Sequence, residues 1–236
     1  MISVNNLTKK RGSATILQNL SFQVKSGRVT GFLGPNGAGK SSTIRILLGL
    51  DQATSGNALI NGIPYIKLKN PLYTVGAVLD GSGAHPARTG RNHLKWIAQA
   101  AGISTSRVDE VLEIVGLTQA ASKRVKQYSL GMSRRLALGA ALLGDPDILI
   151  LDEPTNGLDP EGIRWLRNFL HKRAQSGKTV LLSSHLMGET AETVDDVIII
   201  NHGQIIANGT LREVIGAHSC LEDAFFTLIK HDGGKQ

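Results

Sequence analysis

The sequence is poor in cysteine and in aromatic residues. Cys220 is the only cysteine among 236 residues, so no disulfide can form within the chain, which suits a reducing compartment. Aromatic residues make up 4% of the chain, whereas aliphatic residues bring the hydrophobic share to 41%. This composition is typical of a globular α/β protein.

Long hydrophobic runs are also missing. No apolar stretch approaches the ~18–20 residues that span a bilayer, and Met1–Asn6 lack the apolar core of a signal peptide. We therefore expect a cytoplasmic protein. The net charge of +7 leaves two interpretations open, a membrane-proximal or partner-facing surface and a nucleic-acid surface. We favour the first, because the chain has no RNA-binding aromatic motif and no cluster of zinc ligands.

Residues 34–42, which read GPNGAGKSS, have the phosphate-binding pattern G-x-x-x-x-G-K-S. They lie between a strand-like segment, Val29–Leu33, and a helix-like segment, Thr43–Gly49, which is the context that the pattern requires. Glycines let backbone N–H groups surround a phosphate, and the helix N-terminus adds its dipole. Lys40 supplies positive charge near the terminal phosphates, and Ser41 offers a hydroxyl to Mg²⁺. The predicted nucleotide-binding residues of this loop are Gly34, Pro35, Asn36, Gly37, Ala38, Gly39, Lys40, Ser41 and Ser42.

Strand and helix patterns alternate on both sides of a helical stretch. Apolar alternation predicts two strands within residues 2–24, joined by a turn at Arg11–Ser13, and helical periodicity runs from Arg91 to about Gly144. Further strands are predicted at 75–79, 148–151, 179–183 and 197–200, the last followed by a hairpin.

The sequence therefore predicts one α/β domain of the P-loop NTPase (RecA-like) type with a mostly parallel sheet. We expect its core at about residues 1–81 and 145–230, with an antiparallel β subdomain. A helical subdomain is inserted at about 82–144, and 231–236 form a flexible tail.

Two adjacent carboxylates, Asp152 and Glu153, follow the apolar segment Ile148–Leu151. Burying carboxylates at the end of a buried strand costs free energy unless they have partners. Because side chains alternate along a strand, the two point differently and can take different roles. We interpret Asp152 as an Mg²⁺ ligand, directly or through water, and Glu153 as the base that activates the attacking water. His185 ends another strand and is interpreted as a donor that holds the γ-phosphate in line.

These motifs, with residues 128–132 and 156–159 between them, come in the order typical of one family. The chain resembles the nucleotide-binding subunit of an ATP-binding cassette (ABC) transporter. More narrowly, it is similar to the separate ATPase subunits of exporters for antibiotics, bacitracin-like and lantibiotic peptides, or polysaccharides. The resemblance extends from Ile2 to about Ile229. It implies an ATPase that uses ATP and Mg²⁺ to power an exporter from the inner face of the cell membrane.

The resemblance also implies partners. These are a membrane-spanning permease subunit and a second, identical ATPase subunit, paired head to tail. Ser129 and Gly131 would reach the γ-phosphate held by the other subunit, and Asp159 would lie across the interface. Asp80 falls where the family usually has a glutamine that senses Mg²⁺ and contacts the membrane subunit. The loop 81–91 would receive the coupling helix of that subunit.

The chain departs from the family pattern at three places. The signature is usually Leu-Ser-Gly-Gly-Gln, whereas residues 128–132 read Tyr-Ser-Leu-Gly-Met and keep Ser129 and Gly131. Asp80 replaces the glutamine, so Mg²⁺ coordination is altered or water-mediated. Arg11 stands near the position where an aromatic residue usually stacks on adenine, and a guanidinium plane can stack too.

Two rival functions stay open. A soluble ABC protein that acts on nucleic acid or ribosomes would fit the positive charge, but such proteins usually carry two cassettes or a long coiled coil. The chain has neither, and we expect no nucleic-acid partner. A non-hydrolytic nucleotide-binding scaffold would not need Asp152, Glu153 and His185.

Overall fold

The computed structural model describes residues 1–79 and 83–232, with the backbone alone for the last two of these. The chain divides into two compact units. Unit 1 contains Met1–Lys69 and Arg167–Gln236, and unit 2 contains Asn70–Leu166. Each unit has its own sheet strands and its own buried side chains.

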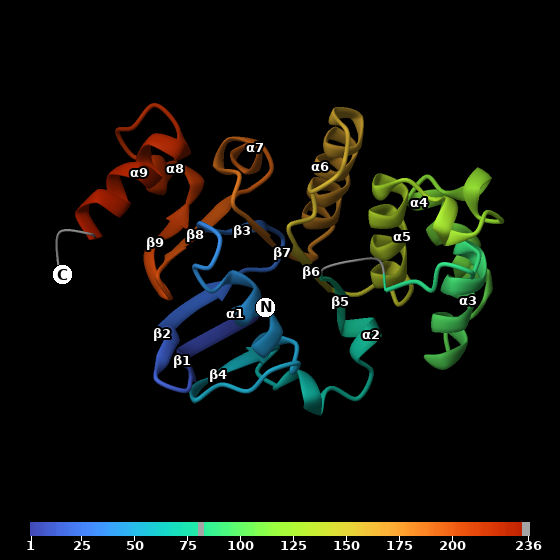
Figure 1. Cartoon of the computed structure of the whole chain (residues 1–236), viewed down its shortest axis with the longest axis horizontal. Helices are drawn as coiled ribbons and strands as arrows, with labels where there is room; N and C mark the ends of the chain where they lie inside the picture. Colours follow the sequence, from blue (N-terminus) through green and yellow to red (C-terminus); the bar gives the residue numbers. More distant parts are fainter. Residues whose placement is uncertain (80–82, 233–236) are drawn as a thin grey trace. The chain divides into compact units, whose positions relative to one another are not determined.

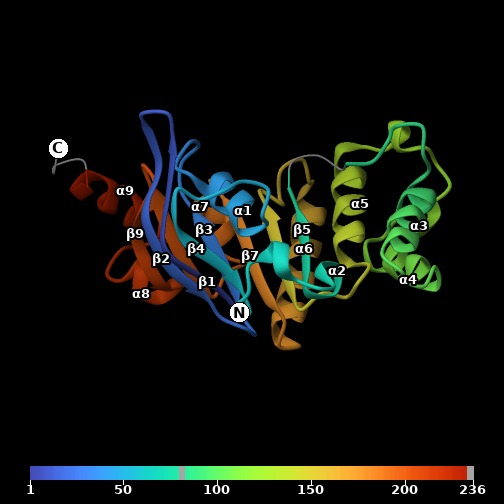
Figure 2. The ribbon, with the colours of Figure 1, turned by 90° about the horizontal axis from the view of Figure 1, so that it is seen from below.

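An antiparallel sheet forms the N-terminal part of unit 1. Strands β1 (Ile2–Arg11), β2 (Ala14–Val24) and β4 (Ser55–Ile60) are ordered β2-β1-β4 and lie side by side in Figure 2. The predicted strand pair of residues 2–24 is therefore confirmed. Phe22 of this sheet packs against Phe32, with ring centroids 5.4 Å apart. This contact joins the antiparallel sheet to the parallel strands of the same unit.

The remaining strands of unit 1 are ordered β7-β3-β8-β9 (Figure 1). Strand β3 (Val29–Leu33) is parallel to β7 (Thr179–Ser184) and to β8 (Asp196–Asn201), and every residue of these three strands is buried. Continuous apolar runs, such as Val197–Ile200 in β8, fit strands covered on both faces. Strand β9 (Gln204–Thr210) pairs antiparallel with β8, so the predicted hairpin is confirmed.

The helices of unit 1 follow these strands in sequence. Helix α1 comes directly after the loop that ends β3, and the short α7 comes after β7. The chain closes with α8 and α9. Their bounds are α1 (Lys40–Leu47), the 3₁₀ turn η1 (Tyr65–Lys67), α7 (Met187–Ala191), α8 (Leu211–Ile215) and α9 (Leu221–Asp232).

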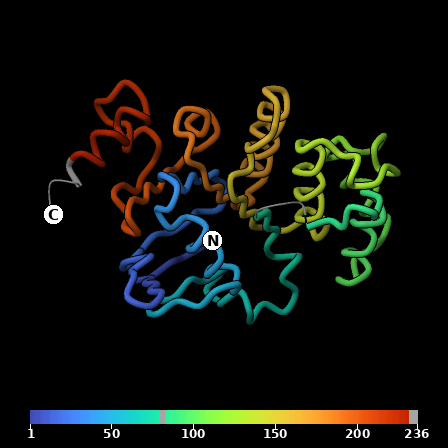
Figure 3. Tube along the Cα trace, in the orientation of Figure 1, coloured from blue at the N-terminus to red at the C-terminus, as the bar shows by residue number. Residues whose placement is uncertain are grey.

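Unit 2 contains two parallel strands, β5 (Val75–Val78) and β6 (Ile148–Asp152). The tube in Figure 3 follows the green and yellow-green part of the chain through its helices. Leu94, Val111 and Leu136, one from each long helix, are fully buried, as the predicted periodicity requires. The helical elements are α2 (Pro71–Thr74), α3 (Gly90–Ala100), α4 (Ser106–Ile114), η2 (Thr118–Ala120), η3 (Val125–Gln127) and α5 (Leu130–Leu142), and α6 (Pro160–Gln175) begins here.

The fold class is the one predicted, an α/β protein with mostly parallel strands, an antiparallel sheet and helices. In residues 1–79 and 83–232, no helix combines the length and the apolar character needed to cross a membrane.

Candidate nucleotide-binding site

The phosphate loop connects strand β3 to helix α1 in unit 1. Gly39 precedes the first helical residue with φ +111°, and the first turn of α1 carries no acidic side chain. The N-terminus of α1 and the positive end of its dipole therefore lie at the loop without a competing carboxylate in that turn. Asn36 and Gly37 are exposed at the tip, whereas Ala38 and Gly39 are buried. This arrangement suits a phosphate group.

Lys40 folds back over the loop that precedes it. Its Nζ donates to the carbonyl oxygens of Gly34 (2.8 Å) and Pro35 (3.2 Å), and the residue is 6% exposed. A buried ammonium group needs such acceptors, and the oxygens of an anionic ligand are stronger ones. Ser41 is exposed beside it, where its hydroxyl can serve a metal ion.

Strand β2 and the turn of the β8–β9 hairpin both contact the phosphate loop. A Cβ atom added to Gly39 would lie 2.5 Å from Leu17 Cδ2 and 3.3 Å from the carbonyl oxygen of Ile16. The N–H of Gly203, in the hairpin turn, donates to Ala38 O at 3.0 Å. The loop therefore takes its shape from β2 and the hairpin as well as from its own glycines.

His185 lies at the same sheet edge as the phosphate loop. Leu33 of β3 pairs with Ser184 of β7, and Gly34 N donates to Ser184 O at 3.3 Å. His185 is the next residue along and is half-buried. Unit 1 thus brings the histidine beside the start of the loop, because parallel strands end at one edge of their sheet.

Arg11 ends strand β1, and its side chain is 61% exposed. Its Nη2 donates to Asp51 Oδ2 at 3.3 Å. Asp51 comes shortly after α1 in the chain, and no motif in the sequence pointed to it.

The acidic pair terminates β6 in unit 2. Asp152 is the last residue of the strand and is 4% exposed, whereas Glu153 is half-buried with φ +48°. The backbone thus leaves the strand conformation at Glu153, directly after the last strand residue. Asp152 supplies the kind of oxygen ligand that Mg²⁺ prefers.

The residues predicted to face a second subunit also lie in unit 2, and the structure brings them together. Ser129 caps helix α5, with its Oγ accepting a hydrogen bond from Met132 N at 3.1 Å. Asp159 caps α6, with its Oδ1 accepting from Gly162 N at 2.7 Å. A Cβ atom built on Gly131 would lie 3.6 Å from Gly157 O. Residues 129–131 and 156–159 are therefore neighbours.

One predicted ligand, Asp80, lies outside the described residues, as do the first two residues of the loop 81–91. In the described ranges, no group of three or more His, Cys, Asp or Glu side chains could hold a metal ion. Mg²⁺ does not need such a group, because it is usually bound by one or two carboxylates, water and phosphate oxygens.

Comparison with protein families gives two matches. A model described as "ABC transporter" matches residues 17–156. A second one, described as "AAA domain, putative AbiEii toxin, Type IV TA system", matches residues 123–190. The first covers more than half of the chain and includes the phosphate loop and the acidic pair.

Several curated proteins are similar over most of the chain. YhcH of Bacillus subtilis (strain 168), an "Uncharacterized ABC transporter ATP-binding protein", is 42% identical over 87% of this chain and 68% of its own length. The "Bacitracin transport ATP-binding protein BcrA" of Bacillus licheniformis is 44% identical over 87% and 68%, respectively. The "Lantibiotic transport ATP-binding protein SrtF" of Streptococcus pyogenes is 36% identical over 95% and 96%.

Solved structures agree with the fold. An ATP-binding subunit of an ABC transporter has a TM-score of 0.88 and 26% identity, covering 97% of this chain and 99% of its own. MJ0796, described as a bacterial ABC transporter cassette in a dimeric structure, has a TM-score of 0.80 and 25% identity, covering 90% and 99%. The predicted resemblance, fold and ATPase domain are all confirmed. The chain belongs to the ABC transporter family, as one of its ATP-binding proteins.

Proposed function

We propose that this chain hydrolyses ATP to power a membrane exporter and works as a pair of identical subunits. The phosphate loop of unit 1 carries the proposal. Its buried Lys40, together with the N-terminus of α1, which has no acidic residue in its first turn, suits an anion. The names of the relatives BcrA and SrtF, which refer to bacitracin and lantibiotic transport, support an exporter of antimicrobial compounds.

The predicted catalytic and metal-binding residues each have a role in the proposed reaction. Lys40 exchanges the carbonyl oxygens of Gly34 and Pro35 for the terminal phosphate oxygens, which are more strongly charged acceptors. Glu153 takes the proton of the attacking water, and His185 donates a hydrogen bond that holds the γ-phosphate in line. Ser41 and Asp152, with Asp80, would hold Mg²⁺, which neutralises charge on the phosphates when bound.

The second copy completes the site in this proposal. Helix α5 has no acidic residue in its first turn, and Ser129 and Leu130 at its start are exposed. Because the Oγ of Ser129 already accepts a hydrogen bond from Met132 N, its hydroxyl hydrogen is available to donate to a phosphate oxygen. Ser129 and Gly131 of one subunit therefore contact the γ-phosphate bound to its partner, and Asp159 lies across the same interface.

The membrane partner is a permease subunit that holds the pair at the inner face of the membrane. We favour this partner over nucleic acid or the ribosome because the relatives named above are ATP-binding proteins of transporters. Co-purification with the permease, followed by stimulation of ATP hydrolysis by candidate cargoes, tests this part of the proposal.

The test of the catalytic proposal compares Glu153→Gln with Glu113→Gln. Glu113 is exposed on helix α4 of the same unit, so its variant is matched in charge. We expect Glu153→Gln to bind ATP and dimerise but to lose about 10²–10⁴-fold in turnover, which is the usual contribution of a general base. Glu113→Gln should hydrolyse ATP at the wild-type rate. Near-normal hydrolysis by Glu153→Gln would remove Glu153 as the base.

The paired site has its own test. Specific activity should rise with protein concentration, because isolated subunits bind ATP but lack Ser129 and Gly131 of a partner. Full activity at concentrations where the chain is strictly monomeric would contradict the shared site.

The phosphate loop is tested by Lys40→Ala. This variant should lose ATP affinity, and unchanged affinity would count against the phosphate loop.

A further inference from the structure

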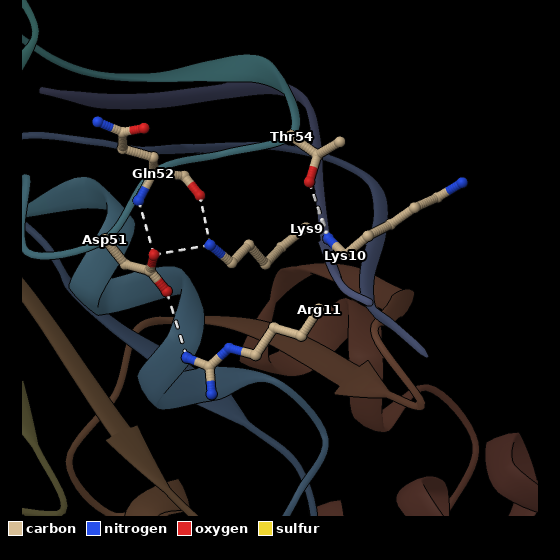
Figure 4. Close-up of polar contacts among 6 residues, drawn as sticks. All are labelled: Lys9, Lys10, Arg11, Asp51, Gln52 and Thr54. Atoms are coloured by element: carbon tan, nitrogen blue, oxygen red, sulfur yellow. Dashed lines mark hydrogen bonds and ion pairs between the residues drawn. The ribbon is translucent and has the colours of Figure 1, made fainter. Parts of the chain in front are cut away.

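Asp51 gathers two cationic side chains from strand β1 (Figure 4). Lys9 Nζ donates to Asp51 Oδ1 at 2.6 Å, and Arg11 Nη2 donates to Asp51 Oδ2 at 3.3 Å. Oδ1 also accepts from the backbone N–H of Gln52 at 2.8 Å, and Lys9 Nζ donates to Gln52 O at 2.7 Å. The two oxygens of Asp51 thus have different partners: Oδ1 accepts from Lys9 Nζ and Gln52 N, and Oδ2 accepts from Arg11 Nη2.

The two cations differ in their exposure. The Lys9 side chain is 12% exposed and that of Asp51 21%, so this pair is the inner part of the cluster. Arg11, at 61% exposed, lies at its rim. Asp51 is therefore held by Lys9 on its inner side, and its Oδ2 accepts a hydrogen bond from the more exposed Arg11 guanidinium.

This cluster lies close to the phosphate loop within unit 1. Lys9 is paired with Leu17 of strand β2, and Leu17 is the residue that packs against Gly39 at the start of α1. Arg11 is two residues further along β1, and two strand residues span about 6.6 Å. The Cα atom of Arg11 thus lies two strand residues beyond Lys9, whose partner Leu17 packs against the loop.

The geometry of the Arg11 contact leaves a stacking surface. A carboxylate binds a guanidinium at its edge, through N–H groups that lie in the plane of the group. The flat faces of Arg11 are therefore left to solvent or to a ligand. Guanidinium planes stack on nucleic-acid bases, and a flexible arginine loses less entropy on stacking when its edge is already held.

We propose that Asp51 is a positioning residue for base recognition, holding the Arg11 guanidinium so that its face stacks on the base of the bound nucleoside triphosphate. This inference rests on the proposed function, because it assumes that the phosphates of that ligand occupy the loop. The site should prefer purine over pyrimidine nucleotides, since the larger ring system covers more of the guanidinium.

The experiment measures Kd for ATP and for inorganic tripolyphosphate with the full chain. Tripolyphosphate fills the loop but has no base, so it reports on phosphate binding alone. We expect Asp51→Asn and Arg11→Ala each to raise the Kd for ATP about five- to tenfold, at the low end of base-stacking effects. The Kd for tripolyphosphate should change less than twofold, and the double variant should be no worse than Arg11→Ala.

Lys10→Ala is the matched control. It removes a positive charge from the same strand, but the Lys10 side chain points away from Asp51 in Figure 4, and its backbone N–H donates to Thr54 Oγ1. It should leave the ratio of the two Kd values at the wild-type level. Arg11→Tyr in the Asp51→Asn background should restore ATP affinity, because an aromatic ring stacks without a carboxylate to orient it.

Three outcomes would overturn the inference. Equal changes in the Kd for ATP and for tripolyphosphate would mean that Asp51 acts on the loop or on its electrostatic field. Additive losses in the double variant would mean that Asp51 and Arg11 act separately. Failure of the wild-type chain to bind ATP would overturn the proposed function as well, whereas ATP binding that is insensitive to Asp51→Asn would overturn this inference alone.

Discussion

Alanine substitutions at two glycines of the phosphate loop separate the cost of the backbone conformation from the cost of packing against strand β2. Gly37 and Gly39 both have positive φ, +82° and +111°. An added Cβ meets nothing within 4 Å at Gly37, but lies 2.5 Å from Leu17 Cδ2 at Gly39. Alanine at the two positions therefore shares the conformational cost and differs in the steric one.

The expected magnitudes follow from this difference. Alanine in such a backbone region costs about 1–3 kcal/mol, and Gly37→Ala should show the lower part of that range. Leu17 is fully buried and cannot swing into solvent, so Gly39→Ala adds an overpacking cost of about 1–3 kcal/mol. For a chain of this size 1 kcal/mol corresponds to about 2–4 °C in Tm. Gly39→Ala should therefore melt several degrees below Gly37→Ala.

Thermal unfolding without nucleotide, followed by circular dichroism, measures the two Tm values. Nucleotide is left out because both residues belong to the predicted binding loop, and ligand binding would add its own stabilisation. If Gly39→Ala were as stable as Gly37→Ala, the contact between Leu17 and the loop would not constrain it, and the reasoning would be wrong.

Three further predictions concern charged residues outside the loop. The hydrogen bond from Lys9, and then that from Gln52 N–H, lower the pKa of Asp51 from 3.8 to about 2. Since the pKa of Asp51 is lower in the folded state than in the unfolded state, the stability that Asp51 adds is complete above about pH 4 and is lost as the pH falls towards 2. The Tm difference between wild type and Asp51→Asn should therefore be constant from pH 7 to about pH 4 and smaller at pH 3. Asp196→Ala should lower Tm by about 3–12 °C, because Arg28 binds both oxygens of Asp196 (2.5 and 2.7 Å) and charged hydrogen bonds contribute about 1.5–3 kcal/mol. A shift below 1 °C would show that the pair is only a surface contact. Arg135→Met should cost about 1 kcal/mol in urea unfolding, since the guanidinium lies 4.4 Å from the Trp165 ring centroid, and an unchanged midpoint would argue against that contact.

The sequence predicted the parts of the molecule whose causes are local. The phosphate loop, its strand and its helix are contiguous, so residue types and spacing were enough to identify them. The mostly apolar strands β3 and β6 were equally clear, because strands buried on both faces show a continuous apolar run in place of an alternating pattern. Helix α7 was not predicted, since its five residues carry too little periodicity.

Contacts between distant segments were beyond the sequence. Asp51 is 40 residues from Arg11, and no spacing rule links them; only the fold brings the segment after α1 beside the end of β1. The left-handed backbone at Glu153 was likewise not expected from an apolar strand that runs into two carboxylates.

The sequence by itself thus determined the family, the fold class and the phosphate loop, because these depend on short-range patterns of glycine, charge and hydrophobicity. Only the tertiary structure decided which strand supports the loop, which residue holds Arg11, and that residues 129–131 lie against residues 156–159. Such contacts arise from packing between elements that are far apart in the chain, and a linear pattern does not encode them in any local signal.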